Sequence, residues 1–225
     1  MSTRFEVDAL LFDLDGTLVD SIGDLALAAN GMLDELGRPA RTLEEVRRFV
    51  GKGIPKLVER CLGDAALPDA DFEAAVEVFK RHYAQTNGRV SQAYPGVVEM
   101  LDTLRRQGLP MGCVTNKAAA FTEPLLQQTG LAPYFDVVVS GDTLEVKKPH
   151  PGMLLHACQR LGVDIARTLM VGDSANDAES ARAAGCPVLL MTWGYTEGVP
   201  VDTIECDGLL SSANALLQRI APRVP

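Results

Sequence analysis

Residues 7–17 read VDALLFDLDGT, a short apolar run that ends in two carboxylates and a glycine. Such a run, without regular polar alternation, is typical of a strand that is buried on both faces of a parallel sheet. Four later runs have the same character, at residues 109–114, 135–139, 168–171 and 187–192. The sequence therefore predicts five buried strands, the first at residues 7–12.

Helical patterns separate the later apolar runs, at residues 118–129, 152–161 and 175–184. Strands that alternate with helices of about ten residues predict right-handed βαβ units. The predicted fold class is therefore α/β, with a Rossmann-like parallel sheet between two layers of helices.

Residues 21–89 interrupt this alternation, because they contain only helical patterns. These patterns cover residues 22–36, 43–49, 55–62 and 71–83. Gly37 suits a helix end, and Pro95 is expected to open a further helix that runs to Gly108. The sequence predicts an α/β core formed by residues 1–20 and 90–225, with an all-helical cap, residues 21–89, inserted after the first strand.

Polar residues follow four of the predicted strands, the third after a short loop. They are Asp13-Leu14-Asp15-Gly16-Thr17, Thr115-Asn116, Lys147-Lys148-Pro149 and the segment from Gly172 to Asp177. Ligands bind at the carboxyl ends of strands in open α/β sheets, so these groups are expected to meet. Carboxylates gathered at one place repel and need a cation, and an all-oxygen set suits Mg²⁺.

Each of these segments also has a purely structural interpretation. Asp15-Gly16 fits an ordinary turn, and Thr115-Asn116 fits a helix cap. Lys147-Lys148 fits a solvated loop, and Asp173 or Asp177 fits a helix N-terminus. The occurrence of all four at successive strand ends favours a functional site.

The four segments resemble the signature motifs of the haloacid dehalogenase superfamily, and the resemblance covers nearly the whole chain. The helical block after the first motif resembles that superfamily's type 1 cap. The stretch from Gly51 to Arg60 and Lys148-Pro149-His150-Pro151 are similar to bacterial phosphoglycolate phosphatases.

The resemblance implies a role for each carboxylate. Asp13 is implied as the nucleophile that forms an aspartyl-phosphate, and Asp15 as the general acid and then base. Mg²⁺ is the implied cofactor, held by Asp13, the Asp15 backbone carbonyl and Asp173. Superfamily members that preserve the intermediate, such as ion-pumping ATPases, carry Thr at the Asp15 position, so Asp15 favours a phosphatase or a mutase.

The resemblance also implies which groups bind the phosphoryl oxygens. They are the Thr115 and Lys148 side chains and backbone N–H groups near Leu14 and Asn116. Lys148 is preferred over Lys147 because the superfamily's lysine directly precedes the proline. Asp177 and Ser174 are implied to support these groups, with Asp177 orienting Lys148 or a metal-bound water.

Substrate choice is expected to come from the cap, because the core motifs recognise only phosphate. Gly51-Lys52-Gly53 joins two helical patterns, where glycines let the backbone approach a ligand. The Lys52 amine is a candidate to bind a substrate carboxylate. The alternative is a helix-linking turn with a solvated lysine.

The expected activity is Mg²⁺-dependent hydrolysis of a small phosphate ester, with 2-phosphoglycolate giving glycolate and phosphate as the leading reaction. A phosphosugar mutase remains an alternative, as does a phosphatase for pyrophosphate, an amino-sugar phosphate or a nucleotide. A non-catalytic binding module is disfavoured, because Asp13, Asp15, Lys148 and Asp173 are all present.

Composition limits the other classes of function. The 225 residues carry a net charge of −9, which argues against binding to nucleic acid or to an anionic membrane. No apolar stretch approaches the length of a membrane-spanning helix, and the N-terminus lacks a signal-peptide pattern, so a cytoplasmic location is expected. The five cysteines are expected to be reduced. The chain is expected to act as a monomer or homodimer.

Overall fold

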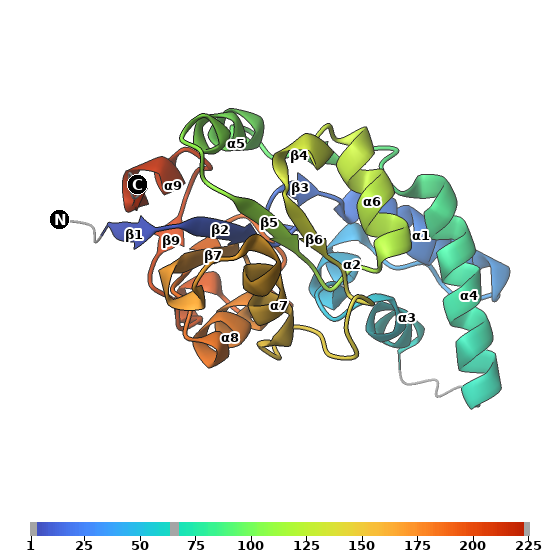
Figure 1. The fold of residues 1–225 in the computed structure, drawn as a ribbon. Helices are drawn as coiled ribbons and strands as arrows, with labels where there is room; N and C mark the ends of the chain where they lie inside the picture. Colours follow the sequence, from blue (N-terminus) through green and yellow to red (C-terminus); the bar gives the residue numbers. More distant parts are fainter. Residues whose placement is uncertain (1–3, 64–67, 223–225) are drawn as a thin grey trace.

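One parallel sheet of six strands organises the computed structural model, which describes residues 4–63 and 68–222 (Figure 1). The strand order is β6-β5-β2-β7-β8-β9. The bounds are β2 (Ala9–Phe12), β5 (Met111–Val114), β6 (Val137–Val139), β7 (Thr168–Gly172), β8 (Val188–Met191) and β9 (Leu209–Leu210). The α/β prediction with a Rossmann-like sheet is confirmed, and five of these six strands fall within or overlap the predicted runs.

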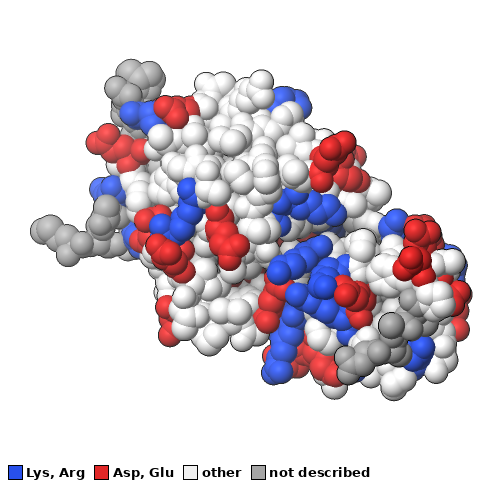
Figure 2. Space-filling model, turned by 90° about the horizontal axis from the view of Figure 1, so that it is seen from below, with Lys and Arg blue, Asp and Glu red and all other residues white. Residues whose placement is uncertain are grey.

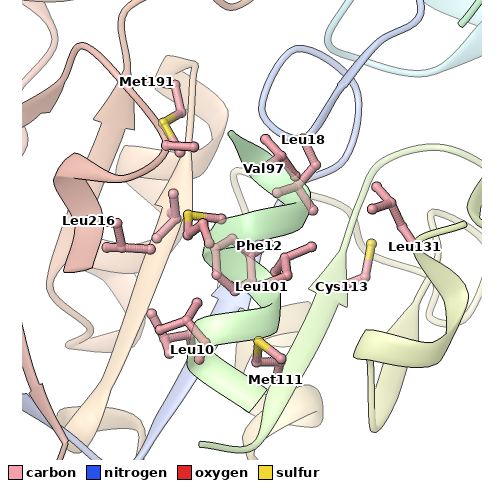
Figure 3. Packing of buried hydrophobic residues seen from close by; sticks show 14 of the residues in the cluster. Leu10, Phe12, Leu18, Val97, Leu101, Met111, Cys113, Leu131, Met191 and Leu216 are labelled. Atoms are coloured by element: carbon pink, nitrogen blue, oxygen red, sulfur yellow. The ribbon is translucent and has the colours of Figure 1, made fainter. Parts of the chain in front are cut away.

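Helices cover both faces of the sheet. On one face lie α5 (Val97–Arg106), α6 (Ala119–Gln128) and α9 (Ala215–Arg219); on the other lie α7 (Gly152–Leu161) and α8 (Ala175–Ala184). Alternate residues of β2 pack against the two helical layers. Leu10 and Phe12 pack with α5 and α9 (Figure 3). Leu11 packs with α7 and α8 on the other face. Burial of apolar side chains on both faces explains the unbroken apolar run.

The first apolar run forms two strands instead of one. Asp8 separates β1 (Phe5–Val7) from β2, and β1 pairs with β10 (Ile220–Pro222) near the two chain ends. The Asp8 carboxylate accepts hydrogen bonds from the Arg167 guanidinium. The prediction of one strand over residues 7–12 was therefore wrong at Asp8, and neither β9 nor β10 was predicted.

Four helices follow the first motif: α1 (Ile22–Glu35), α2 (Leu43–Phe49), α3 (Ile54–Leu62) and α4 (Asp69–Thr86). They lie at the end of the molecule away from the chain termini (Figure 1), and residues 21–89 are here termed the helical insert. Thr42 and Glu45 form a reciprocal capping box that begins α2. The insert has its own apolar cluster, which Phe121 and Tyr195 join from outside it.

The junction of the insert holds features that the sequence did not indicate. Strands β3 (Val19–Asp20) and β4 (Gln92–Ala93) pair in antiparallel fashion where the chain leaves and rejoins the core. The buried Asp24 carboxylate of α1 accepts hydrogen bonds from the backbone N–H groups of Gly88, Val90 and Ser91. It therefore fastens the returning chain to α1.

The helix after the junction begins later than expected. Helix α5 starts at Val97 and ends at Arg106, with Gly96 before it in the left-handed region at φ 81°. The prediction that Pro95 opens this helix was wrong, because the chain turns at Gly96 before the helical conformation starts. Among the described residues, no helix is long and apolar enough to cross a membrane.

Candidate active site

A cavity of about 60 Å³ lies between the carboxyl ends of the central strands and the helical insert. Side chains that follow β2, β5 and β7 form one wall, and residues of α1, α3 and α4 with the segment 50–53 form the other. The cavity brings together most of the residues that the sequence singled out: Asp13, Asp15, Gly51, Gly53, Thr115, Asn116, Lys148, Asp173, Ser174 and Asp177.

Lys148 is the centre of the charged cluster. Its buried ammonium lies 2.9 Å from Asp13 Oδ1 and 2.7 Å from Asp177 Oδ1, and it donates to the Val114 carbonyl at 2.7 Å. Burial by itself lowers the pKa of the Lys148 ammonium, but the Asp13 and Asp177 carboxylates raise it above its ordinary value. Lys148 therefore stays charged beside Asp13.

Lys147 lies elsewhere, although it precedes Lys148 directly. It is exposed, and its ammonium lies near Gly53 of the helical insert. The choice of Lys148 over Lys147 therefore agrees with the geometry.

Asp173 follows β7 and is held by groups from two other segments. Thr17 Oγ1 donates to Asp173 Oδ1 at 2.6 Å, and the Tyr195 backbone N–H donates to Asp173 Oδ2 at 2.6 Å. Gly16, with φ 87°, lies so close that a Cβ on it would fall 2.5 Å from Asp173 Oδ2. Glycine is therefore needed after Asp15 both for the turn and for the approach of Asp173.

Asp177 and Ser174 support the cluster from the start of α8. The Asp177 Oδ2 atom accepts hydrogen bonds from Ser174 Oγ at 2.8 Å and from the backbone N–H groups of Asp173 and Ser174. Since its Oδ1 accepts from Lys148, both oxygens are engaged. Asp177 therefore combines the helix-capping interpretation with an orienting contact to Lys148.

Oxygens of Asp13, Asp173 and Asp177 lie within 4.8 Å of one another. Burial raises the pKa of the Asp13 carboxyl to about 6, although Lys148 lowers it in part. Burial raises the pKa of Asp173 well above its ordinary range, and repulsion from Asp177 and Asp13 adds to the rise. The cluster therefore has an excess of negative charge and an all-oxygen donor set, which fits a hard divalent cation at Asp13 and Asp173.

The segment after β5 joins the two walls. Thr115 is buried, and its hydroxyl accepts a hydrogen bond from the Lys117 backbone N–H at 3.2 Å. The Asn116 amide donates to the carbonyls of Lys148 and Gly51, at 2.9 and 3.0 Å. Asn116 thus fixes the backbone of Lys148 and holds the segment 50–53 of the helical insert against the core. The Leu14 backbone N–H faces the Asp13 carboxylate.

Asp15 points toward the helical insert, away from the other carboxylates. Ser21 Oγ donates to its Oδ1 at 2.6 Å, and the Lys117 ammonium lies 3.1 Å from its Oδ2. Of the expected metal ligands, Asp15 therefore has only its backbone carbonyl to offer. The Lys117 ammonium also donates to the Tyr83 hydroxyl of α4 and lies 4.7 Å from the centre of that ring.

Sequence reasoning missed Lys117 and Tyr83. Lys117 directly follows Thr115-Asn116 at a strand end, so its position gave a signal that was not used. Tyr83 occupies an apolar position of a helical pattern, and nothing in the sequence separates it from a packing residue.

Lys52 lies apart from the cavity. Its side chain is 49% exposed and its ammonium lies 4.0 Å from Glu197 Oε2, whereas Gly51 and Gly53 on either side line the cavity. Glu197, in the loop after β8, also pairs with Arg60 of α3 and accepts a hydrogen bond from Asn176 at 3.0 Å. Glu197 therefore links the core to the insert, a role that no feature of the sequence indicated.

Basic side chains gather near the middle of the face of the molecule shown in Figure 2, among acidic ones.

Fold and site together define a class: Rossmann-like α/β proteins with an acidic site at the strand ends beneath a helical insert. The sequence model of the haloacid dehalogenase-like hydrolase family matches residues 7–185, so the chain belongs to that family. The predicted family is thereby confirmed.

Relatives and solved structures agree with the match. The chain is 48% identical over 219 residues to a phosphoglycolate phosphatase of Nitrosospira multiformis, covering 95% of this chain and 96% of that one. A crystal structure described as a predicted phosphoglycolate phosphatase from Haemophilus somnus superposes with a TM-score of 0.90 at 31% identity, covering 94% and 97% of the two chains. CbbY from Rhodobacter sphaeroides, solved with phosphate, superposes with a TM-score of 0.77 at 26% identity, covering 93% and 96%.

Proposed function

We propose that this protein is a phosphomonoesterase that hydrolyses 2-phosphoglycolate to glycolate and phosphate. The observation that carries the proposal is Asp13, paired with the buried Lys148 ammonium at 2.9 Å, at the floor of a cavity that also holds Asp15. The phosphoglycolate phosphatase with 48% identity supports the choice of substrate.

The two carboxylates have separate roles in the proposed reaction. An Asp13 oxygen attacks phosphorus, the bond from phosphorus to the ester oxygen breaks, and an aspartyl-phosphate forms. Asp15 gives a proton to the departing oxygen and then takes one from the water that hydrolyses the intermediate. The two side chains suit this division because Asp13 lies beside Lys148, whereas Asp15 accepts a hydrogen bond from Ser21 at the start of the helical insert.

Other groups stabilise the phosphoryl oxygens. The Lys148 ammonium lies 2.9 Å from Asp13 Oδ1, and Thr115 and Asn116 line the same cavity, with the Leu14 backbone N–H facing Asp13. Such fixed donors stabilise the charge that develops during transfer. We propose that the helical insert acts as the cap, because its residues form one wall of the cavity. A cap over the reacting groups would exclude water during the reaction.

We propose Mg²⁺ as the cofactor, held by Asp13, Asp173 and the Asp15 backbone carbonyl. The crowding of Asp13, Asp173 and Asp177 oxygens within 4.8 Å supports a divalent cation there. When bound, Mg²⁺ supplies positive charge that offsets the repulsion between Asp13 and the anionic substrate.

The test is phosphate release by the purified protein with Mg²⁺ and a panel of esters. The panel contains 2-phosphoglycolate, pyrophosphate, glucose 1-phosphate, N-acetylmuramic acid 6-phosphate, phosphoserine and a nucleoside monophosphate. We expect kcat/KM for 2-phosphoglycolate to exceed the others by about tenfold or more, which is about 1.4 kcal/mol of transition-state binding. Isomerisation of glucose 1-phosphate without phosphate release would instead identify a mutase.

Asp13→Asn tests whether the measured phosphate release comes from this protein or from a contaminating phosphatase. We expect kcat to fall by a factor on the order of 10⁴, because the nucleophile is lost. Asp34→Asn, at an exposed position of α1, is the matched control and keeps its activity. Turnover by Asp13→Asn at the wild-type rate would exclude Asp13 as the nucleophile.

We further propose that the protein acts in the cytoplasm on small phosphate esters, as a monomer or homodimer. The similarity to a phosphoglycolate phosphatase, 48% identical over 219 residues, supports a small phosphate ester as the substrate.

A further inference from the structure

The insert wall of the cavity offers very little polarity to a substrate. The apolar side chains of this wall are Leu25, Val50, Ile54 and Leu57. Within residues 4–63 and 68–222, the helices of the insert contribute one polar side-chain group to the cavity, the Tyr83 hydroxyl. A leaving group that enters this space therefore meets an apolar surface over most of its outline.

Two cations line the cavity in the described part of the chain, Lys117 and Lys148. Lys148 already contacts two carboxylates and a carbonyl, so its donors are engaged on the side of the phosphoryl group. Lys117 is 8% exposed, and its ammonium contacts both the Asp15 carboxylate and the Tyr83 hydroxyl of the insert. Of these two cations, Lys117 is therefore the one placed to recognise an anion on the leaving group.

The surroundings of Lys117 show that its amine is held at a defined point. Its ammonium lies 3.1 and 3.2 Å from the two Asp15 oxygens and donates to the Tyr83 hydroxyl. An ammonium has three N–H donors, and burying one is unfavourable unless it is paired. A carboxylate that replaced part of the contact with Asp15 would keep the amine paired.

We propose that Lys117, together with the Tyr83 hydroxyl, binds a carboxylate of the leaving group and makes the site selective for phosphate esters of short 2-hydroxy acids. This inference rests on the proposed phosphatase function, because it takes Asp15 as the group that protonates the departing oxygen. Lys117 touches Asp15, so the recognised anion must lie close to that oxygen. A carboxylate on the carbon that bears the ester oxygen meets this requirement, whereas the anion of a longer chain is displaced toward the apolar wall.

The first test needs no variant and compares 2-phosphoglycolate with ethyl phosphate, which has the same chain length but no carboxylate. We expect wild-type kcat/KM to favour 2-phosphoglycolate by at least about 100-fold, within the range of a lost charge-assisted contact. Equal rates for the two esters would overturn the carboxylate site and leave the phosphatase function standing. Release of phosphate from neither ester nor any other panel member would contradict the proposed function itself.

The second test asks whether Lys117 is the residue responsible. In Lys117→Met, we expect the ratio of kcat/KM for 2-phosphoglycolate to that for ethyl phosphate to fall at least 30-fold, mainly through KM. Lys80→Met, at a lysine of α4 whose side chain is 43% exposed, is the matched control and leaves the ratio unchanged. If Lys117 serves only to position Asp15, both esters lose activity equally and the ratio stays constant, which would overturn the proposal.

If Lys117→Met does not fold, Tyr83→Phe tests the same carboxylate site. This variant retains the ring that packs against Phe79 and Phe121 and removes only the hydroxyl. We expect the same ratio to fall about tenfold, the effect of one hydrogen bond to a charged group. An unchanged ratio in a folded Tyr83→Phe variant would overturn the proposed carboxylate site.

Discussion

The two walls of the cavity are built on different principles. The sheet wall holds Asp13, Lys148, Asp173 and Asp177 at strand ends, each fixed by short contacts to its neighbours. The insert wall is mostly apolar and comes from helices with a hydrophobic cluster of their own. The contrast indicates that the sheet wall carries the reaction and that the insert wall selects the leaving group.

Several specific polar contacts join the two walls. Asn116 donates to the Gly51 carbonyl, Glu197 pairs with Arg60, and the Tyr195 hydroxyl accepts hydrogen bonds from the Ser21 and Ile22 N–H groups at the start of α1. These links hold the insert over the strand ends. Perturbing one wall at a time therefore tests whether their functions are separate.

Among the perturbations that follow, removal of the metal should have the largest effect, because the cation offsets the negative charge of Asp13 and Asp173 on the sheet wall. With EDTA, we expect phosphate release to fall at least about 100-fold and to return with Mg²⁺. Mg²⁺ should also raise the Tm of the wild type, because it binds the folded state and relieves repulsion among the carboxylates. Asp173→Asn should lose this rise in Tm, and full activity in EDTA would contradict the magnesium proposal.

Asp24→Asn should reduce stability by about 2–3 kcal/mol, because Asp24 is buried and its carboxylate accepts several hydrogen bonds. An amide group would turn a donor toward N–H groups that need an acceptor. Urea unfolding of this variant and of Asp34→Asn would measure the difference. A change below about 0.5 kcal/mol, the range of ordinary surface substitutions, would show that the junction does not depend on Asp24.

Glu197→Gln should have a moderate effect, because it weakens the link between the loop after β8 and α3. The Arg60–Glu197 pair is partly exposed, so its loss is worth at most about 1 kcal/mol, or about fivefold in kcat/KM. Raising the ionic strength should reduce the difference in kcat/KM between the variant and the wild type. A loss of 100-fold or more would show that the two walls are not separable at this point.

Lys52→Met should have the smallest effect, less than about twofold in kcat/KM for 2-phosphoglycolate, as for a solvated surface lysine. The expectation follows from the position of its amine outside the cavity, beside Glu197. Steady-state kinetics of Lys52→Met beside Lys117→Met would compare the two lysines directly. A larger loss of kcat/KM in Lys52→Met would support the prediction that the segment 51–53 determines substrate specificity.

Much of the sheet wall could be predicted from the sequence, since each group directly follows a strand or opens a helix. Thr115 lies one residue after β5, and Asp173 lies one residue after β7. A parallel sheet brings such positions to one edge whatever the details of packing. Strand bounds were less accurate, because Asp8 ends pairing within an otherwise apolar run.

The insert wall could not be predicted in the same way. Its helices were indicated by their periodicity, but periodicity does not say which apolar residues face a ligand and which face one another. Lys52 stood out because glycines flank it, yet the turn directs its amine to Glu197. Tyr83 did not stand out, although α4 places its hydroxyl on Lys117.

By itself, the sequence determined the α/β class, the helical insert and the line of carboxylates, threonine and lysine at the strand ends. These follow from periodicities of two and 3.6 residues and from the position of polar groups after apolar runs. Only the tertiary structure decided that Lys117 meets Asp15 and Tyr83, residues 102 and 34 positions away. Such contacts depend on how helices pack on a sheet, and that packing is fixed by the shapes of many side chains together.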